Sequence, residues 1–331
     1  MTIRLPRRST TIALATAGAL ASTGTAYLGA RNLLVGQATH ARTVIPRAWD
    51  IPPRADGIYT AGGGPVERWR RGMTADLHLM IFGDSTATGY GCISAEEVPG
   101  VLIARGLAER TGKRIRFSTK AIVGATSKGV SGQVDAMFVA GPPPDAAVMM
   151  LGANDITALN GISQSARRLG MAVRKLRARG AVVIVGTCPD LGVISAIPQP
   201  LRSLAHSRTS QLARAQTAAV RSAGGVPVPL AQLLAPEFRT RRELMFSPDG
   251  FHPSPIAYAL AADALLLALC DKLGEKTDEE PVEAPVMDEA EPSAAEPVLG
   301  QQHSQISVMS RLWRRPVPGP APSSYPQVGS D

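Results

Sequence analysis

Short apolar segments alternate with longer amphipathic segments through the middle of the chain. The short segments predict strands at residues 77–82, 114–120, 146–151, 181–186 and 226–230. The longer segments predict helices at residues 99–111, 163–179, 203–223 and 254–270. Strands that alternate with helices favour parallel pairing through right-handed crossovers. The pattern therefore predicts an α/β fold, a three-layer α/β/α sandwich over residues 75–273.

The segments on either side of this domain lack sustained periodicity. Residues 37–74 hold scattered prolines and three consecutive glycines, a pattern that predicts a linker or an irregular wrap. Residues 274–331 are acidic and rich in Pro and Ala at first, and then rich in Gln and Pro. Such a composition buries too little apolar surface to fold alone, so we expect a disordered tail.

Residues 1–36 have the pattern of a signal peptide or an N-terminal membrane anchor. Arg4, Arg7 and Arg8 precede a stretch, residues 9–30, that contains no charged side chain. As a helix this stretch would be about 33 Å long, close to the thickness of a bilayer core. Basic residues before an uncharged segment predict a cytoplasmic N-terminus and an exported body. We therefore expect an extracytoplasmic protein of the cell envelope that is membrane-associated through its N-terminus.

The net charge of +8 is unevenly distributed along the chain. Residues 271–300 hold ten acidic side chains and two lysines, whereas the part before them is basic. A basic body is compatible with attraction to anionic lipid or with solubility alone. The arginines are not interleaved with aromatic residues and no nucleic-acid motif is present, so nucleic acid is not an expected partner. The pattern gives no indication of oligomeric state.

Residues with chemical potential follow several of the predicted strands. Ser85 follows the first strand in "GDST", Gly124 follows the second, and Asn154 follows the third in "GAND". Asp249 and His252 lie in "DGFHP", after the last strand. Parallel sheets bind ligands in the crevice beyond the carboxyl ends of their strands. We therefore expect these residues, far apart in the sequence, to meet there.

These residue types meet the requirements of hydrolysis by a serine. The serine needs a base, a carboxylate that orients the base, and donors for the oxyanion that develops. Ser85, His252 and Asp249 are candidates for the first three roles. The backbone N–H groups of Ser85 and Gly124 and the side-chain amide of Asn154 are candidates for the donors.

The order of these motifs resembles that of the SGNH (GDSL-type) hydrolases. Ser85 in "GDST", Gly124, Asn154 in "GAND" and His252 in "DGFHP" follow the order of the four family blocks. The resemblance implies a flavodoxin-like sandwich with a parallel five-stranded sheet, and ester hydrolysis. It further implies a triad of Ser85, Asp249 and His252, with Gly124 and Asn154 in the oxyanion hole.

Two positions depart from the family pattern. Thr86 stands where the first motif often has Leu, which is a tolerable change. Ile122 stands where the family often has Asn, two residues before Gly124. The second departure leaves Gly129 and Gly132 as alternatives to Gly124.

Each candidate also has a structural interpretation. Ser85 at a strand-to-helix turn is typical of a helix N-cap. Asn154 is compatible with a turn, and His252 with a surface loop. We expect Asp84 and Asp155 to hold loops in shape through local hydrogen bonds rather than to take part in acid–base chemistry.

The other histidines are poor candidates for the base. His40 lies in the predicted linker, His303 in the tail and His206 early in a predicted helix. His78 lies within the first predicted strand, where a structural role is expected.

Other hydrolase chemistries lack sequence support. There is no GxSxG motif, because Ala87 occupies its last position. No His or carboxylate spacing is typical of a metal site, so neither a metal nor another cofactor is expected. Cys92 and Cys188 follow predicted strands and could form a disulfide, whereas Cys270 ends an apolar helix and is expected to be buried and inert.

The sequence therefore predicts an exported serine esterase that acts through an acyl-enzyme. No apolar lid or long insertion is evident, which favours short acyl groups on lipid or cell-envelope glycan. Two alternatives remain: an O-acyltransferase that uses the same site, and a non-catalytic anchored scaffold.

Overall fold

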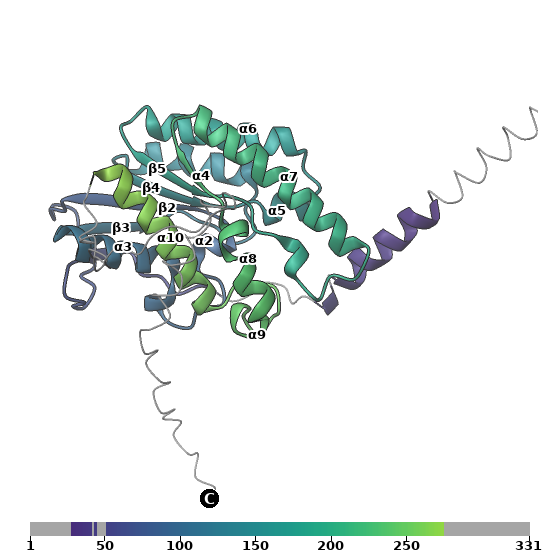
Figure 1. The fold of residues 1–331 in the computed structure, drawn as a ribbon. Helices are drawn as coiled ribbons and strands as arrows, with labels where there is room; N and C mark the ends of the chain where they lie inside the picture. Colours follow the sequence, from purple (N-terminus) through teal and green to yellow (C-terminus); the bar gives the residue numbers. More distant parts are fainter. Residues whose placement is uncertain (1–27, 42, 45–50, 275–331) are drawn as a thin grey trace, which may run out of the picture. The chain divides into compact units, whose positions relative to one another are not determined.

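A computed structural model describes residues 28–41, 43–44 and 51–274 (Figure 1). Most of the predicted signal or anchor, and the predicted tail beyond Gly274, lie outside the described residues. Residues 28–41 are helical. Within the described ranges, no helix combines the length and the apolar character needed to span a bilayer.

A six-stranded sheet in the order β1-β3-β2-β4-β5-β6 forms the centre of the domain (Figure 1). The strands are β1 (Gly57–Tyr59), β2 (Leu77–Gly83), β3 (Ile115–Thr119), β4 (Ala146–Met150), β5 (Val182–Gly186) and β6 (Val226–Val228). Strands β2 to β6 pair in parallel and correspond to the five strands predicted from the sequence. Their order is that of flavodoxin-like sheets, so the predicted parallel arrangement is confirmed.

Strand β1 is an addition that the sequence analysis did not predict. It pairs antiparallel with β3, from Gly57 opposite Phe117 to Tyr59 opposite Ile115. A strand of three residues is too short for its alternation to stand out from a loop. The sheet is therefore mixed, and the predicted wrap is partly regular.

Helices cover both faces of the sheet (Figure 1). On one face lie α3 (Pro99–Thr111) and α10 (Pro255–Leu273), and on the other lie α4 (Ser127–Ala140), α6 (Ile162–Arg177) and α7 (Leu201–Ser222). Shorter elements are α2 (Ser85–Thr88), η1 (Ala95–Glu97), α5 (Ala153–Thr157), η2 (Leu191–Val193), α8 (Leu230–Thr240) and α9 (Arg242–Met245). The four predicted helices correspond to α3, α6, α7 and α10, and the three-layer sandwich is confirmed.

Strand β2 is apolar because both of its faces are buried. Leu79 and Ile81 pack into the cluster under α3 and α10, whereas Met80 and Phe82 pack into the cluster under α4 and α6. Successive strand residues point to opposite faces, so this alternation fills both cores. Each such side chain contributes about 1.5–3 kcal/mol when it is fully buried.

Helix α8 was also missed by the sequence analysis. It contains Pro236, and a proline inside a helical pattern ordinarily predicts a break. Pro229 stands immediately before the helix, which further obscures the pattern. This helix matters for function because it forms part of a cavity wall described below.

The backbone at the end of β2 approaches β4 unusually closely at Gly83. Gly83 is paired with Met150, and its φ of +142° is one that side chains rarely allow. A Cβ atom at this position would overlap the carbonyl oxygen of Met150. The same carbonyl accepts a hydrogen bond from the N–H of Asp84 at 3.1 Å. Glycine is therefore required here for the strand to end beside β4.

We predict that Gly83→Ala lowers the free energy of unfolding by about 3 kcal/mol or more, because the methyl group forces the two strands apart. Gly132→Ala is the matched control, since Gly132 lies in α4 with open space around it. That control should raise stability by about 1 kcal/mol through helix propensity. Thermal and urea unfolding measure both changes, and equal effects of the two substitutions would contradict the prediction.

Candidate active site

Ser85 opens helix α2 immediately after β2, and its hydroxyl is not used to cap that helix. The N-cap is Asp84, whose carboxylate accepts hydrogen bonds from the N–H of Thr86 at 3.0 Å and from its hydroxyl at 2.7 Å. The expectation that Ser85 could be the N-cap is therefore wrong, because the preceding residue takes that position. The Ser85 hydroxyl is left to face the rest of the site.

A short loop before α10 holds a histidine and a carboxylate together. The imidazole Nδ1 of His252 lies 2.6 Å from Oδ2 of Asp249. The other carboxylate oxygen accepts the backbone N–H groups of Phe251 and His252, both at 2.9 Å. Burial raises the pKa of Asp249, but the hydrogen bonds from His252 and Phe251 outweigh it, and the pKa lies below its usual value. The loop thus favours an ionised Asp249 that orients the imidazole.

The other imidazole nitrogen of His252, Nε2, lies 3.1 Å from Oγ of Ser85. The two residues are 167 positions apart in the sequence, and both are at least nine-tenths buried. The ring of Tyr90 lies 4.3 Å from the imidazole and that of Phe251 lies 5.0 Å from it. Tyr90 is itself held by a hydrogen bond from the hydroxyl of Tyr258 to its carbonyl, at 2.9 Å. The predicted Ser–His–Asp constellation is therefore present as geometry.

Asn154 and Gly124 follow the two strands that flank β2, Asn154 after β4 and Gly124 after β3. The amide of Asn154, in α5, donates to the carbonyl of Ala125 at 3.2 Å and lies 3.5 Å from a carboxylate oxygen of Asp84. Gly124 lies in the exposed turn before α4, with a φ of +81°. The contact with Ala125 thus brings this turn beside Asn154.

The two alternatives to Gly124 are placed differently. Gly129 and Gly132 both lie inside helix α4, Gly129 in its first turn and Gly132 beyond it, where the backbone N–H group bonds within the helix. Gly124 precedes the helix, so its N–H group is the better candidate for an oxyanion donor.

Asp155 joins the two loops that carry Gly124 and Asn154. Its carboxylate accepts hydrogen bonds from the backbone N–H and the hydroxyl of Ser127, both at 2.8 Å. It also accepts from the amide of Asn160 at 2.9 Å and the hydroxyl of Ser165 at 2.7 Å. This agrees with the expectation of a structural role, because the buried carboxylate accepts four hydrogen bonds from other parts of the protein.

Asp84 also has surroundings that agree with a structural role. The pKa of its carboxyl lies above the usual value, because burial raises the pKa by more than its hydrogen bonds with Thr86 and Gly152 and the nearby imidazole of His252 lower it. Its side chain is almost fully buried beneath the site. Asp84 therefore braces the Ser85 turn from below.

The remaining histidines of the described chain lie away from this constellation. His78 lies in β2, with Nε2 3.0 Å from the hydroxyl of Ser118, and burial lowers its pKa to about 4. His206 lies on α7 and pairs with Asp190 at 2.8 Å. His40 is exposed in the helix at residues 28–41, and His303 lies outside the described residues.

The predicted disulfide between Cys92 and Cys188 is wrong. None of the three cysteines forms a disulfide, and all three are buried. The thiol of Cys92 donates to the carbonyl of Glu97 at 3.3 Å, and that of Cys188 donates to the carbonyl of Pro189 at 3.4 Å. Each of the two thiols thus has a hydrogen-bond partner other than the second cysteine. The strands that precede the two cysteines, β2 and β5, are separated by β4.

An apolar cavity of about 100 Å³ opens beside Ser85, Asn154 and His252. Its walls come from α8 and from the loop after β5, and they include Leu191, Ile194, Leu230, Leu234 and Phe238. We call it the apolar cavity. The chain thus has an apolar wall that the sequence analysis did not anticipate.

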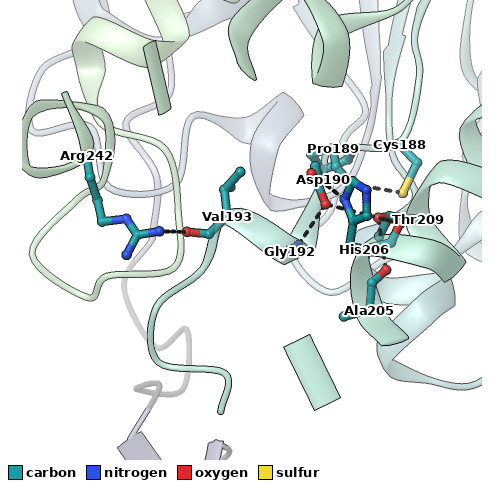
Figure 2. Close-up of polar contacts among 9 residues, drawn as sticks. All are labelled: Cys188, Pro189, Asp190, Gly192, Val193, Ala205, His206, Thr209 and Arg242. Atoms are coloured by element: carbon teal, nitrogen blue, oxygen red, sulfur yellow. Dashed lines mark hydrogen bonds and ion pairs between the residues drawn. The ribbon is translucent and has the colours of Figure 1, made fainter. Parts of the chain in front are cut away.

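Hydrogen bonds hold the loop after β5 that lines the apolar cavity (Figure 2). Asp190 accepts the N–H of Gly192 at 2.7 Å and faces the imidazole of His206 at 2.8 Å. Arg242, on α9, donates to the carbonyl of Val193 at 2.8 Å. The loop is therefore fastened both to α7 and to the α8–α9 side of the cavity.

No group of three or more His, Cys, Asp or Glu side chains in the described ranges has the arrangement of a metal site. What the geometry can do chemically is activate a hydroxyl. An imidazole oriented by a carboxylate lies within hydrogen-bond reach of a buried serine, at the mouth of an apolar cavity.

The sequence profile of the GDSL-like lipase/acylhydrolase family matches residues 81–260. The chain belongs to this family. The matched segment includes Ser85, Gly124, Asn154, Asp249 and His252, and the resemblance inferred from the four motifs is confirmed.

Known proteins of the GDSL family resemble the chain over different lengths. The GDSL-like esterase Rv1075c of Mycobacterium tuberculosis is 74% identical over 317 residues, which are 96% of this chain and 98% of that protein. The crystal structure of a lipase/acylhydrolase from Enterococcus faecalis has the same fold, with a TM-score of 0.50 and 19% identity. That likeness covers 61% of this chain and 99% of the other.

We predict that Asp155→Asn lowers the free energy of unfolding by about 2–3 kcal/mol, because an amide N–H would then face the buried donors that the carboxylate now accepts. Asp135→Asn is the matched control, since Asp135 forms an exposed ion pair with Lys175. Surface pairs contribute about 0–1 kcal/mol. Urea unfolding measures both changes in the free energy of unfolding. A decrease for Asp155→Asn no larger than that for Asp135→Asn would contradict the structural role of Asp155.

Proposed function

We propose that the protein is an exported, membrane-associated serine esterase that hydrolyses short-chain acyl esters of lipid or cell-envelope glycan through an acyl-enzyme. Membership of the GDSL family makes it a carboxylic ester hydrolase. The observation that carries the proposed mechanism is the hydrogen-bonded chain from Ser85 through His252 to Asp249.

In the proposed mechanism His252 acts first as a base. Its Nε2 removes the proton from the Ser85 hydroxyl as the oxygen attacks the ester carbonyl carbon. Asp249 keeps the other ring nitrogen protonated and stabilises the imidazolium that forms. The imidazolium then gives its proton to the alcohol oxygen as that bond breaks, which leaves an acyl group on Ser85. Water, deprotonated by His252, releases the acid and restores the serine.

The oxyanion of each tetrahedral intermediate needs hydrogen-bond donors close to Ser85. The backbone N–H groups of Ser85 and Gly124 and the side-chain amide of Asn154 are assigned to it. The contacts of Asn154 with Ala125 and Asp84, at 3.2 and 3.5 Å, are long for hydrogen bonds. The oxyanion is a stronger hydrogen-bond acceptor for the amide than these two groups are. The amide therefore stabilises the transition state more than the ground state.

The apolar cavity supports a short acyl chain. Its volume of about 100 Å³ is smaller than that of an engineered apolar cavity of roughly 150 Å³ that holds benzene. An acetyl or butyryl group fits this space, and the apolar walls favour its burial. A long acyl chain would have to extend beyond the cavity into water.

Export and membrane association rest on the sequence alone. Arg4, Arg7 and Arg8 before an uncharged stretch are typical of a segment that directs the following chain across a membrane. Esters of the cell envelope would then be the substrates within reach.

We predict that a fluorophosphonate probe labels the protein at Ser85, and that Ser85→Ala and His252→Ala abolish the labelling. Labelling that survives in both variants would contradict the role of Ser85, and absence of labelling in the unmodified protein would favour the scaffold. Release of the acyl group of a simple ester as free acid, with no acyl sugar formed when sugar acceptors are added, supports hydrolysis over acyl transfer. The same probe applied to fractionated cells should find the protein in the membrane or envelope fraction, and a cytoplasmic signal would contradict export.

We predict that Asn154→Ala lowers kcat by about 100- to 1,000-fold, because one oxyanion donor is lost. KM should change little, since the amide acts on the charge that develops during the reaction. Steady-state kinetics with butyryl esters measure both values. A fall in kcat of less than about threefold would exclude Asn154 from the oxyanion hole.

A further inference from the structure

A second cavity, of about 460 Å³, lies at the carboxyl end of β3 and shares no wall residue with the apolar cavity. It is formed by residues 51–56 of the predicted wrap, by Thr88 and Val98, and by residues 117 and 119–123 at the end of β3. We call it the polar cavity. Neither His252 nor Asp249 lines it, so its walls are independent of the triad.

The sheet order places the two cavities on opposite sides of the nucleophile. Strand β2, which carries Ser85 at its carboxyl end, lies between β3 and β4. The polar cavity is at the end of β3, whereas the apolar cavity is lined by residues that follow β4 and β5. An ester bound at Ser85 would therefore have one cavity available for its acyl chain and the other for its alcohol portion.

The polar cavity begins within one helical turn of the nucleophile. Thr88, which lines it, lies three residues after Ser85 in α2, and its hydroxyl donates to the carbonyl of Ser85 at 2.9 Å. Three residues of helix span about 4.5 Å. On the other side, Ile122 and Val123 line the cavity and directly precede Gly124. The walls thus include the residues next to Gly124, the candidate oxyanion donor.

The walls of the polar cavity offer both donors and acceptors. Arg54 and Lys120 supply cations, and Asp56 supplies a carboxylate that accepts the N–H of Thr119 at 2.9 Å. The hydroxyl of Thr119 is buried and has no hydrogen-bond partner among the described residues. Mixed groups of this kind, without one dominant charge, suit a ligand with several hydroxyl groups, each of which both donates and accepts.

We propose that the polar cavity binds the alcohol portion of the ester and that this portion is a sugar unit, while the acyl chain occupies the apolar cavity. The inference rests on the proposed function of Ser85 and names the substrate class of the same site. Residues 51–56 of the wrap then determine specificity, because they supply Arg54 and Asp56 to the cavity wall. Simple alkyl alcohols leave the polar groups of this cavity without partners.

The test compares two butyryl esters that differ only in the alcohol: ethyl butyrate and a monobutyrate of methyl glucoside. The ratio of their kcat/KM values is measured for the full-length protein, for Arg54→Met and for Lys120→Met. Each substitution should lower the sugar-to-ethyl ratio about tenfold, since one hydrogen bond to a charged group is lost. Arg110→Met is the matched control, because Arg110 is exposed at the end of α3 and lines neither cavity.

The controls separate a failure of this inference from a failure of the proposed function. Methyl glucoside should inhibit ethyl butyrate hydrolysis competitively in the unmodified protein, and less well in Lys120→Met. If the protein is labelled by the fluorophosphonate and hydrolyses ethyl butyrate, but neither variant shifts the ratio beyond Arg110→Met, the sugar site is wrong and the esterase stands. If labelling and ethyl butyrate hydrolysis both fail, the proposed function falls and the sugar site falls with it.

Discussion

The backbone contact between Gly83 and the carbonyl of Met150 is the constraint on which the site depends. Because residue 83 has no side chain, the end of β2 lies directly against β4, and Asp84 donates its N–H to the same carbonyl. Ser85 and Asn154 follow these two strands, so the distance between nucleophile and amide is set in the sheet. A side chain at residue 83 would separate them, whatever the loops did.

The other half of the site is organised locally, within one short loop. Asp249 accepts three hydrogen bonds from groups two and three residues further on, and the N–H of Ser247 donates to the carbonyl of His252 at 2.8 Å. Ser254 caps α10 through its side chain. Asp249 and His252 are thus oriented toward each other by contacts within the loop. Only the docking of this loop on Ser85 depends on long-range folding. Pre-orientation of this kind lowers the ordering cost at the moment of reaction.

The sequence predicted the parallel strands and the triad for different physical reasons. Strand β2 stood out because both of its faces are buried, and Ser85 and His252 stood out because short motifs place them after strands. The strand order is not visible in a sequence, so Cys92 and Cys188 were paired although β4 separates the strands before them. The N-cap of α2 is the residue whose side chain accepts a hydrogen bond from the first turn of the helix. In the structure this residue is Asp84 rather than Ser85.

The cavity walls escaped prediction because they come from the least regular parts of the described chain. Helix α8 contains Pro236, which obscures its pattern, and residues 51–56 have no periodicity at all, yet each forms a wall. The triad, by contrast, lies at strand ends and in one stiff loop, and none of its members lines the polar cavity. Substitutions in these walls can therefore change which ester fits while the hydrogen-bonded chain at Ser85 is kept. Short motifs predict the reaction because the catalytic residues lie at fixed positions of the fold. They do not predict the substrate, because side chains from distant, irregular segments determine which ester binds.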